Sequence, residues 1–256
     1  MADIDKTLKY YNENAQSFAS GTVSVKFTEV QDKFLEKFNP SYFFTYDMIY
    51  KEVESFQGIP DYLGIIMSHL YHGSEKTMQI PINRWHTISI ILAFMKKKQF
   101  RTPNYIIQNT GLSQNIIIRD LNFLCRLGIC EKNNVGNYRF VEDFEMPIAH
   151  IHSFELKMSN WKRALFQAIR YKTFSEYTSI VMPFEKEQIL LQNIDSFKER
   201  NIGVLLFDAY SCETKMLYRA KKNSTISLQH LYYMSGKILL KYHSDLQVSS
   251  NIRIEN

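Results

Sequence analysis

Strand-like and helix-like segments alternate in the C-terminal half of the sequence, from residue 147 to residue 208. The segments IAHIHSFELK, YTSIVMP and IGVLLFD have the apolar, β-branched character of strands, while SNWKRALFQAIRYKTF and EKEQILLQNIDSFKER have the spacing of helices. Such alternation predicts parallel neighbouring strands with helices packed on the sheet. The fold class is therefore predicted to be α/β.

Two further strand-like runs, MIYKEVESF and DYLGIIM, lie between residues 43 and 67, with Gln57-Gly58-Ile59-Pro60 as the turn between them. After the alternating region, residues 215–220 are typical of a strand, and a helix is expected from residue 227 to about 242. Residues 1–38 have helical spacing, and Asn39-Pro40 ends that helix.

The segment between these two regions has the pattern of a winged helix-turn-helix domain. A first helix is expected over residues 84–98. Thr102 caps a second helix that Gly111 ends, and Ser113 caps a third. A hairpin follows, with its turn at residues 134–137. This order resembles bacterial transcription-regulator domains.

That resemblance implies DNA as the partner, because the third helix of such domains enters the major groove. Residues near its start would reach base edges or phosphates: Gln114, Asn115 and Arg119. Basic residues around the helices and the hairpin would contact the phosphate backbone: Lys96, Lys97, Lys98, Arg101, Lys132 and Arg139. The net charge of +5 points the same way. Domains of this kind also act as protein–protein adaptors, so that alternative stays open.

An acid and a base lie two positions apart at the end of the first alternating strand. Glu155 and Lys157 are therefore expected on one face. On the next helix Gln167 and Tyr171 are four apart, and Arg163 lies one turn earlier. Each pattern alone fits a plain ion pair or a solvent-facing helix stripe.

Taken together, these patterns resemble the active-site elements of the PD-(D/E)XK nuclease superfamily, including the Q-x-x-x-Y helix of its RecB-like members. The matching positions are Pro60-Asp61 for the PD element, Glu155 and Lys157 for the second acid and the lysine, Gln167 and Tyr171 for the helix motif, and Glu52 or Glu54, on one face of the preceding strand, for the upstream acid.

The sequence departs from that family in one respect, since Asp61 and Glu155 are 94 positions apart and the winged helix-turn-helix pattern falls between them. The resemblance implies a restriction-endonuclease-like mixed sheet core with an inserted domain, which surface loops tolerate. The expected organisation is an N-terminal helical arm over 1–40, the nuclease-like domain over 41–80 and 147–256, and the inserted domain over 81–146.

The resemblance also implies the chemistry, which is metal-dependent hydrolysis of DNA. Asp61 and Glu155 would hold Mg²⁺ (or Mn²⁺), a cation that prefers carboxylate oxygens and retained water. Lys157 would stabilise developing negative charge, and Glu52 or Glu54 would complete a second metal shell. The remaining candidates would position the phosphate or pack beside it: Gln167, Arg163 and Tyr171.

Two other functions fit the same sequence. The protein could be a non-catalytic DNA-binding regulator that uses the nuclease-like core for dimerisation or ligand binding, with a homodimer as its assembly, or it could be an adaptor without nucleic acid. His150 and His152 alternate on the strand, on the face opposite Glu155, where a zinc pair would lack further ligands nearby.

The start of the sequence resembles the leading helices of class I S-adenosylmethionine-dependent methyltransferases. No Gly-rich loop follows a strand to hold that cofactor, which argues against methyl transfer. Three cysteines in no ligand motif, the absence of an 18-residue apolar run and a polar N-terminal stretch favour a cytoplasmic protein without a membrane segment.

Overall fold

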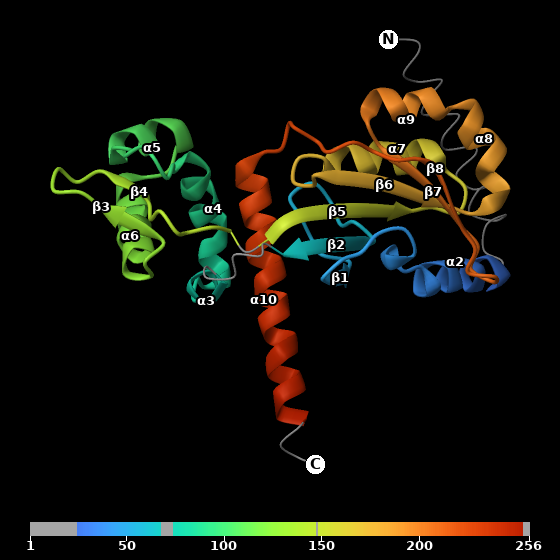
Figure 1. Ribbon diagram of the computed structural model, residues 1–256, viewed down its shortest axis with the longest axis horizontal. Helices are drawn as coiled ribbons and strands as arrows, with labels where there is room; N and C mark the ends of the chain where they lie inside the picture. The colour runs from blue at the N-terminus through green and yellow to red at the C-terminus, as the bar shows by residue number, and fades with distance from the viewer. Residues whose placement is uncertain (1–24, 68–73, 147, 253–256) are drawn as a thin grey trace, which may run out of the picture.

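A six-stranded mixed sheet forms the centre of the computed structural model, which describes residues 25–67, 74–146 and 148–252 (Figure 1). The strand order is β1-β2-β5-β6-β7-β8. Strands β5, β6 and β7 are parallel, as the alternation predicts, and the other pairs are antiparallel. The strands are β1 (Met48–Lys51), β2 (Tyr62–Met67), β5 (Ile148–Leu156), β6 (Tyr177–Met182), β7 (Gly203–Phe207) and β8 (Thr214–Tyr218).

The two faces of the sheet are covered by different helices. Strand side chains such as Ile180 and Val204 pack against α7 (Trp161–Tyr171), α8 (Glu187–Gln192) and α9 (Ile194–Arg200). The alternate residues, such as Phe154, pack against α2 (Val25–Lys37). Side chains alternate between the two faces of a strand. A sheet that is covered on both faces therefore needs apolar residues at nearly every strand position.

The helix α2, which falls within the expected N-terminal helical arm, packs on one face of the sheet. Phe34 and Phe38 of this segment are each 2% exposed and pack with Phe154 and Phe207. Burial of two phenylalanines stabilises this contact by several kcal/mol, at about 1.5–3 kcal/mol per side chain. The first 24 residues, which carry most of the methyltransferase-like stretch, lie outside the described residues.

A unit of three helices and a hairpin, here the helix–hairpin unit, follows β2 in the chain. It comprises α4 (Trp85–Phe94), α5 (Pro103–Thr110), α6 (Gln114–Arg126), β3 (Cys130–Lys132) and β4 (Tyr138–Phe140). The side chains of Thr102 and Ser113 cap α5 and α6, and Gly111 adopts the left-handed conformation that ends α5, which confirms those predictions. The short helix α3 (Ser74–Met78) and a helical turn at Ile82–Arg84 precede α4, and two further turns, Pro40–Tyr42 and Phe184–Lys186, precede β1 and α8.

The first helix of this unit is shorter than expected, since α4 ends at Phe94 rather than near Lys98. Met95 is extended, with ψ of 153°, and the carbonyl of Lys96 accepts a hydrogen bond from Phe140 N. The backbone after Phe94 therefore pairs with the hairpin and cannot continue the helix. The apolar spacing that suggested a longer helix comes from Met95, which is buried in the same core.

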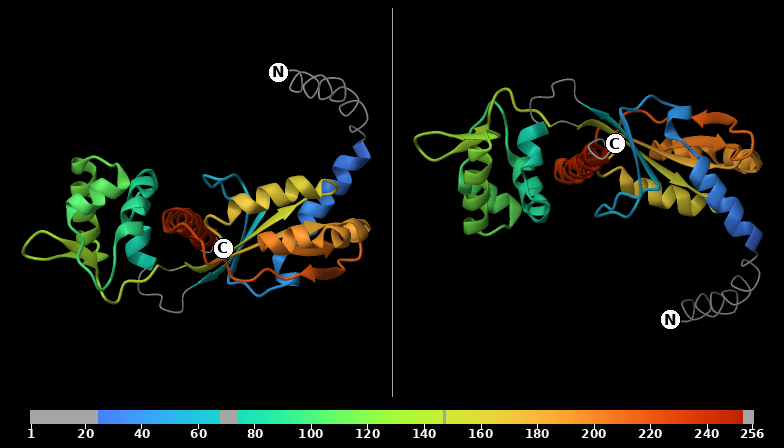
Figure 2. Two further views of the ribbon diagram at one scale, coloured as in Figure 1. Left: turned by 90° about the horizontal axis from the view of Figure 1, so that it is seen from above. Right: turned by 90° about the horizontal axis from the view of Figure 1, so that it is seen from below.

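The long helix α10 (Leu228–Ile252) stands between the sheet and the helix–hairpin unit (Figure 1). Met234 and Ile238 pack in the core of the sheet, while Tyr232 and Leu240 pack against the core of the helix–hairpin unit. Figure 2 shows the same placement of α10 from above and below. The helix was expected to end near Tyr242 and extends to Ile252.

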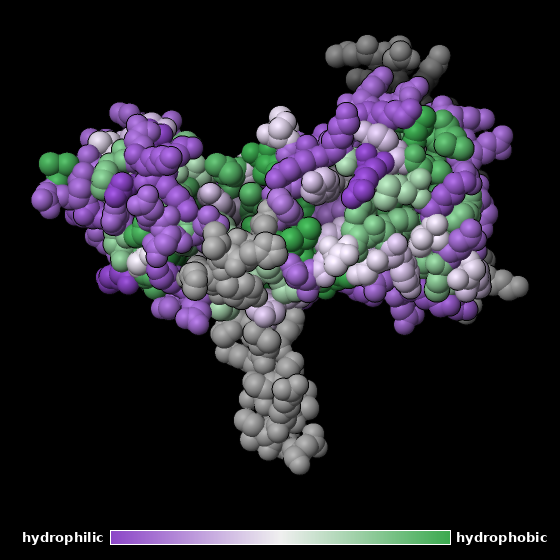
Figure 3. All heavy atoms as spheres, in the orientation of Figure 1, coloured by the Kyte–Doolittle hydropathy of each residue, from purple (hydrophilic) through white to green (hydrophobic). Residues whose placement is uncertain are grey.

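Hydrophilic side chains cover most of the visible face of the helix–hairpin unit, whereas more hydrophobic atoms are exposed over the sheet (Figure 3). None of the helices in the described ranges combines the length and the apolar character needed to cross a bilayer.

Candidate active site

Asp61 and Glu155 meet at one end of the sheet although 94 positions separate them. Asp61 directly precedes β2 and Glu155 lies near the end of β5, and these strands pair with Tyr62 opposite Phe154. The carboxylate oxygen Oδ2 of Asp61 accepts a hydrogen bond from the backbone N of Leu156 at 2.6 Å. The antiparallel register therefore places the two acids side by side.

Glu155 is almost fully buried, with 1% of its surface exposed, and both of its carboxylate oxygens are contacted. Lys157 Nζ forms an ion pair with Oε1. The Tyr171 hydroxyl lies 2.8 Å from Oε2 and 3.0 Å from the carbonyl oxygen of Ile59. A buried charge is tolerated only when it is paired and hydrogen-bonded in this way.

The environment of this cluster changes the proton affinity of two of its members. Burial, reinforced by the nearby charge of Glu155, raises the pKa of Asp61 to about 6. Burial, followed by the Glu155 charge, raises the pKa of Tyr171. Tyr171 therefore keeps its proton at neutral pH and acts as a hydrogen-bond donor to Glu155. The cluster has two neighbouring acids whose mutual repulsion a bound cation would relieve.

Of the two α7 residues expected to position a phosphate, only Gln167 belongs to this cluster. Its side chain is close enough to hydrogen-bond Tyr171 and lower the pKa of that phenol, and its Oε1 is buried with no partner among the described residues. Arg163 is exposed and forms no ion pair within the described part of the chain. The helical stripe predicted from the sequence is therefore divided between the cluster and the solvent.

Glu52 lies beside Asp61, and Glu54 does not. Strand β1 ends at Lys51, so both acids follow the strand, which corrects their expected placement on one strand face. The backbone N of Glu52 donates to the Asp61 carbonyl at 3.2 Å, and φ of Glu52 is 51°. Glu54 instead pairs with Lys237 of α10 at 3.2 Å.

Two acids of α2 also approach the cluster, and the sequence reasoning missed them. Asp32 and Glu36 line a groove of 280 Å³ together with Glu52 and Asp61. Their spacing of one helical turn was a signal that could have found them. In the described ranges, however, no group of three or more acidic, histidine or cysteine side chains is close enough to enclose a metal ion.

The residues expected to contact DNA differ in whether their side chains already have partners within the protein. Gln114 and Asn115 are exposed at the start of α6. The Nε of Arg119 donates to the buried carboxylate of Asp120 at 2.8 Å. Two of the six backbone-contact candidates are also paired, Lys97 with Glu145 at 3.6 Å and Arg139 with Glu131 across the hairpin.

Comparisons with protein-family models, with curated proteins and with solved structures give no significant match to this chain.

Proposed function

We propose that the protein is a metal-dependent DNA nuclease with a restriction-endonuclease-like core, into which a winged helix-turn-helix DNA-reading domain is inserted. The observation that carries the proposal is the meeting of Asp61 with Glu155 and Lys157 on adjacent strands. An E-x-K triplet that occurs by chance is not expected to lie beside an acid from a distant turn.

The order of elements around the cluster also supports the proposal. Antiparallel strands β1, β2 and β5 are followed by α7 and then by β6, which is parallel to β5. Tyr171 of α7 reaches back to Glu155, at the end of the strand that precedes the helix. The last position of the expected Q-x-x-x-Y helix therefore has a physical role, because the Tyr171 hydroxyl donates to Glu155 Oε2.

The donor set suits Mg²⁺ or Mn²⁺. Asp61 and Glu155 offer hard oxygen ligands, and burial together with the nearby charge of Glu155 raises the pKa of Asp61 to about 6, so a cation at this position would favour the ionised carboxylate. Two carboxylates leave the remaining positions to water and phosphate, as Mg²⁺ sites commonly do. When bound, such an ion supplies charge neutralisation at the phosphate and an activated water.

The other residues have roles that follow from their contacts. Lys157 lies beside Glu155 with 24% of its side chain exposed, so its ammonium can reach a phosphate while neutralising the carboxylate. Tyr171 holds Glu155 in place. The free Oε1 of Gln167 is an acceptor for an ordered water or a substrate hydroxyl.

DNA recognition is assigned to the helix–hairpin unit. The N-terminal residues of α6 that would face a major groove, Gln114 and Asn115, are exposed and therefore accessible. Arg119, Lys97 and Arg139 must exchange their carboxylate partners for phosphates, which lowers the net gain from each contact. Sequence reading is thus expected to depend mainly on the two amides.

The test is a cleavage assay with plasmid and linear DNA in Mg²⁺ or Mn²⁺. Lys157→Ala is expected to lower the rate by a factor of about 100, the scale for loss of one electrostatic stabiliser. Glu199→Gln, a change of an exposed acid on α9, is the matched control and should cut like the wild type. Equal residual cutting by Lys157→Ala and the wild type would remove the assignment.

One observation favours the non-catalytic regulator as the second candidate. Both oxygens of Glu155 already have partners in Lys157 and Tyr171, so a cation would have to displace or share them. The regulator predicts salt-dependent DNA binding without cleavage at any Mg²⁺ or Mn²⁺ concentration. Binding without a salt dependence would instead favour an adaptor.

A further inference from the structure

A second cavity lies on the other face of the sheet, at the end opposite Asp61 and Glu155. Its volume is 620 Å³, within the range of roughly 300–1,000 Å³ that is usual for small-molecule sites. It opens over His152 in the middle of β5 and Tyr177 at the start of β6. Nothing in the proposed nuclease chemistry uses it.

Among the described residues that line this cavity, the side chains with a full charge are all cationic and none is an acid. Arg219, Lys221 and Lys222 follow β8 at one side of the opening, and none of the three forms an ion pair within the described residues. Lys222 is close enough to the buried carboxylate of Glu176, which neighbours His150, to oppose the rise in the pKa of Glu176 that burial causes. Three cations around one opening favour an anionic ligand.

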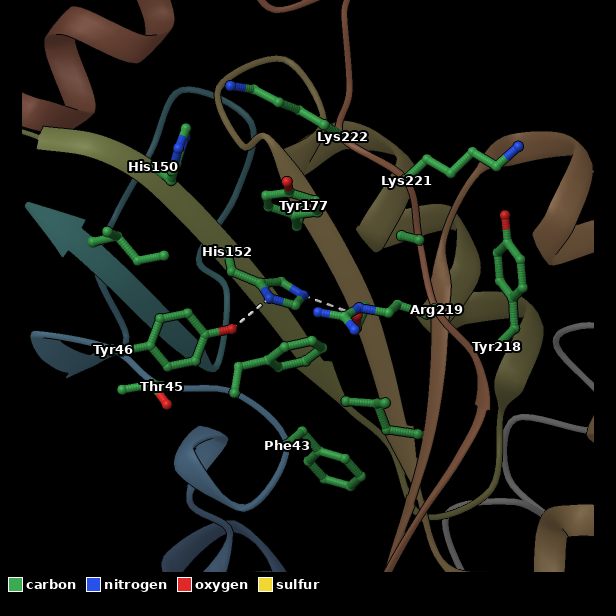
Figure 4. Close-up of a pocket in the computed structure, with 15 residues that line it drawn as sticks. Phe43, Thr45, Tyr46, His150, His152, Tyr177, Tyr218, Arg219, Lys221 and Lys222 are labelled. Atoms are coloured by element: carbon green, nitrogen blue, oxygen red, sulfur yellow. Dashed lines mark hydrogen bonds between the residues drawn. The ribbon is translucent and has the colours of Figure 1, made fainter.

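The walls of the cavity are aromatic. Phe44, Tyr46 and Tyr177 surround the His152 ring, with ring centroids 4.8, 6.0 and 5.7 Å from its centroid. Figure 4 shows Tyr46 and Tyr177 on different sides of His152 and the Arg219 guanidinium directed toward it. Such walls offer stacking surfaces to a planar ring such as a nucleobase.

The floor of the cavity is fixed by hydrogen bonds and by two glycines. His152 Nδ1 bonds the Tyr46 hydroxyl at 2.5 Å, and Nε2 bonds Ser179 Oγ at 2.9 Å. A Cβ at Gly64 would lie 2.5 Å from the Tyr46 ring, and one at Gly203 would lie 2.3 Å from Ser179 Oγ. Only glycine lets these two side chains reach the imidazole, so the floor is ordered before any ligand binds.

Both ring nitrogens of His152 are therefore in use, which excludes it from a zinc pair with His150. Burial, reinforced by Arg219, lowers the pKa of His152 to about 3, so the ring is neutral at physiological pH. Among the described residues, the buried Nδ1 of His150 has no hydrogen-bond partner, since Glu176 Oε1 lies 3.8 Å away. It is a free polar group at the edge of the site.

We propose that this cavity binds a free mononucleotide, with the base between the aromatic walls and the phosphates at Arg219, Lys221 and Lys222. The combination decides the ligand class: a phosphate alone would leave the aromatic walls unused, and a nucleoside alone would leave the cations unpaired. The site is separate from the cluster at Asp61, so the inference does not depend on nuclease activity.

The test is calorimetric titration of the full-length protein, without divalent metal, with adenosine and guanosine mono- and triphosphates and with cytidine and uridine monophosphates. At least one nucleotide is expected to bind saturably with a dissociation constant below about 1 mM. Inorganic phosphate, adenosine and a 5′-phosphorylated oligodeoxynucleotide are the comparison ligands, and each should bind at least ten times more weakly.

Arg219→Ala should weaken nucleotide binding at least tenfold, and Arg170→Ala, an exposed arginine of α7 on the other face, should not change it. If Arg219→Ala fails to fold, Lys221→Ala provides the same comparison, and circular dichroism reports folding in each case. The proposal is overturned if no nucleotide binds, if Arg219→Ala and Lys221→Ala both bind normally, if phosphate binds as tightly as the nucleotides, or if only the oligonucleotide binds.

Discussion

Glu155 lies at one end of the sheet with both carboxylate oxygens contacted by Lys157 and Tyr171, whereas Arg219, at the other end and on the other face, forms no ion pair in the part of the chain that the structure describes. The first charge is buried and is neutralised inside the chain. The second is exposed and lies over a prepared floor. The charge of Glu155 is balanced by groups of the protein itself, whereas the charge of Arg219 remains available to an external anion.

This difference predicts opposite costs of removing the two charges. Glu155→Ala would leave Lys157 and Tyr171 without their shared partner, and loss of one member of a buried pair costs about 3–5 kcal/mol. Arg219→Ala should change the free energy of unfolding by less than about 0.5 kcal/mol, as exposed substitutions usually do. Urea denaturation of both variants measures this contrast. Similar values for the two would contradict it.

The neutral His152 makes the floor of the cavity sensitive to acid. Its pKa in the folded protein, about 3, is below the ordinary value of 6.5, so its contribution to stability is present above pH 6.5 and is lost as the pH falls toward 3. The loss should be several kcal/mol, since each unit of pKa shift corresponds to about 1.4 kcal/mol. His152→Gln should flatten the dependence of unfolding free energy on pH, while the half-exposed His150, changed to Gln, serves as the control. Parallel curves for wild type and His152→Gln would disprove this role.

The Tyr46 ring lies close to Gly64 of β2, so a substitution at Gly64 tests whether the cavity is rigid. Gly64→Ala places a methyl group 2.5 Å from the Tyr46 ring, and overpacking of this kind costs about 1–3 kcal/mol. In combination with Tyr46→Ala the cost should fall, giving a coupling of about 1 kcal/mol in a double-mutant cycle. Additive effects would mean that Tyr46 can move away from the strand without cost.

The smallest expected effect distinguishes two neighbouring acids at the Asp61 end. Glu52 contacts Asp61 through the backbone and contributes to its raised pKa, whereas Glu54 pairs with Lys237. Glu52→Gln should weaken Mn²⁺ binding several-fold, measured by titration calorimetry, because a nearby negative charge is lost. Glu54→Gln should bind Mn²⁺ like the wild type, and an equal effect of both changes would contradict the placement.

Much of the fold could be predicted from local patterns. The caps at Thr102 and Ser113 and the left-handed Gly111 were readable because each depends on one or two neighbouring residues. The alternation of strands and helices likewise indicated β5, β6 and β7. The end of α4 was not readable, because a hydrogen bond from Phe140, 44 positions away in the chain from Lys96, decides it.

The candidate site was only partly predictable for the same reason. Glu155, Lys157 and Tyr171 follow strand and helix periods, so their common direction could be expected. Glu52 rather than Glu54 lies beside Asp61 because of where β1 ends. Gln167 belongs to the cluster and Arg163 does not because of which side of α7 meets the sheet.

The sequence by itself determined the element types, the caps and the set of charged residues near strand ends, because these depend on residues close together in the chain. The tertiary structure decided which charges are neutralised. Strand pairing brought Asp61 to Glu155, and the return of β8 brought Arg219 over His152. A charge gains a partner from a distant segment only when the fold brings the two within a few ångströms. Periodicity along the chain does not report that distance.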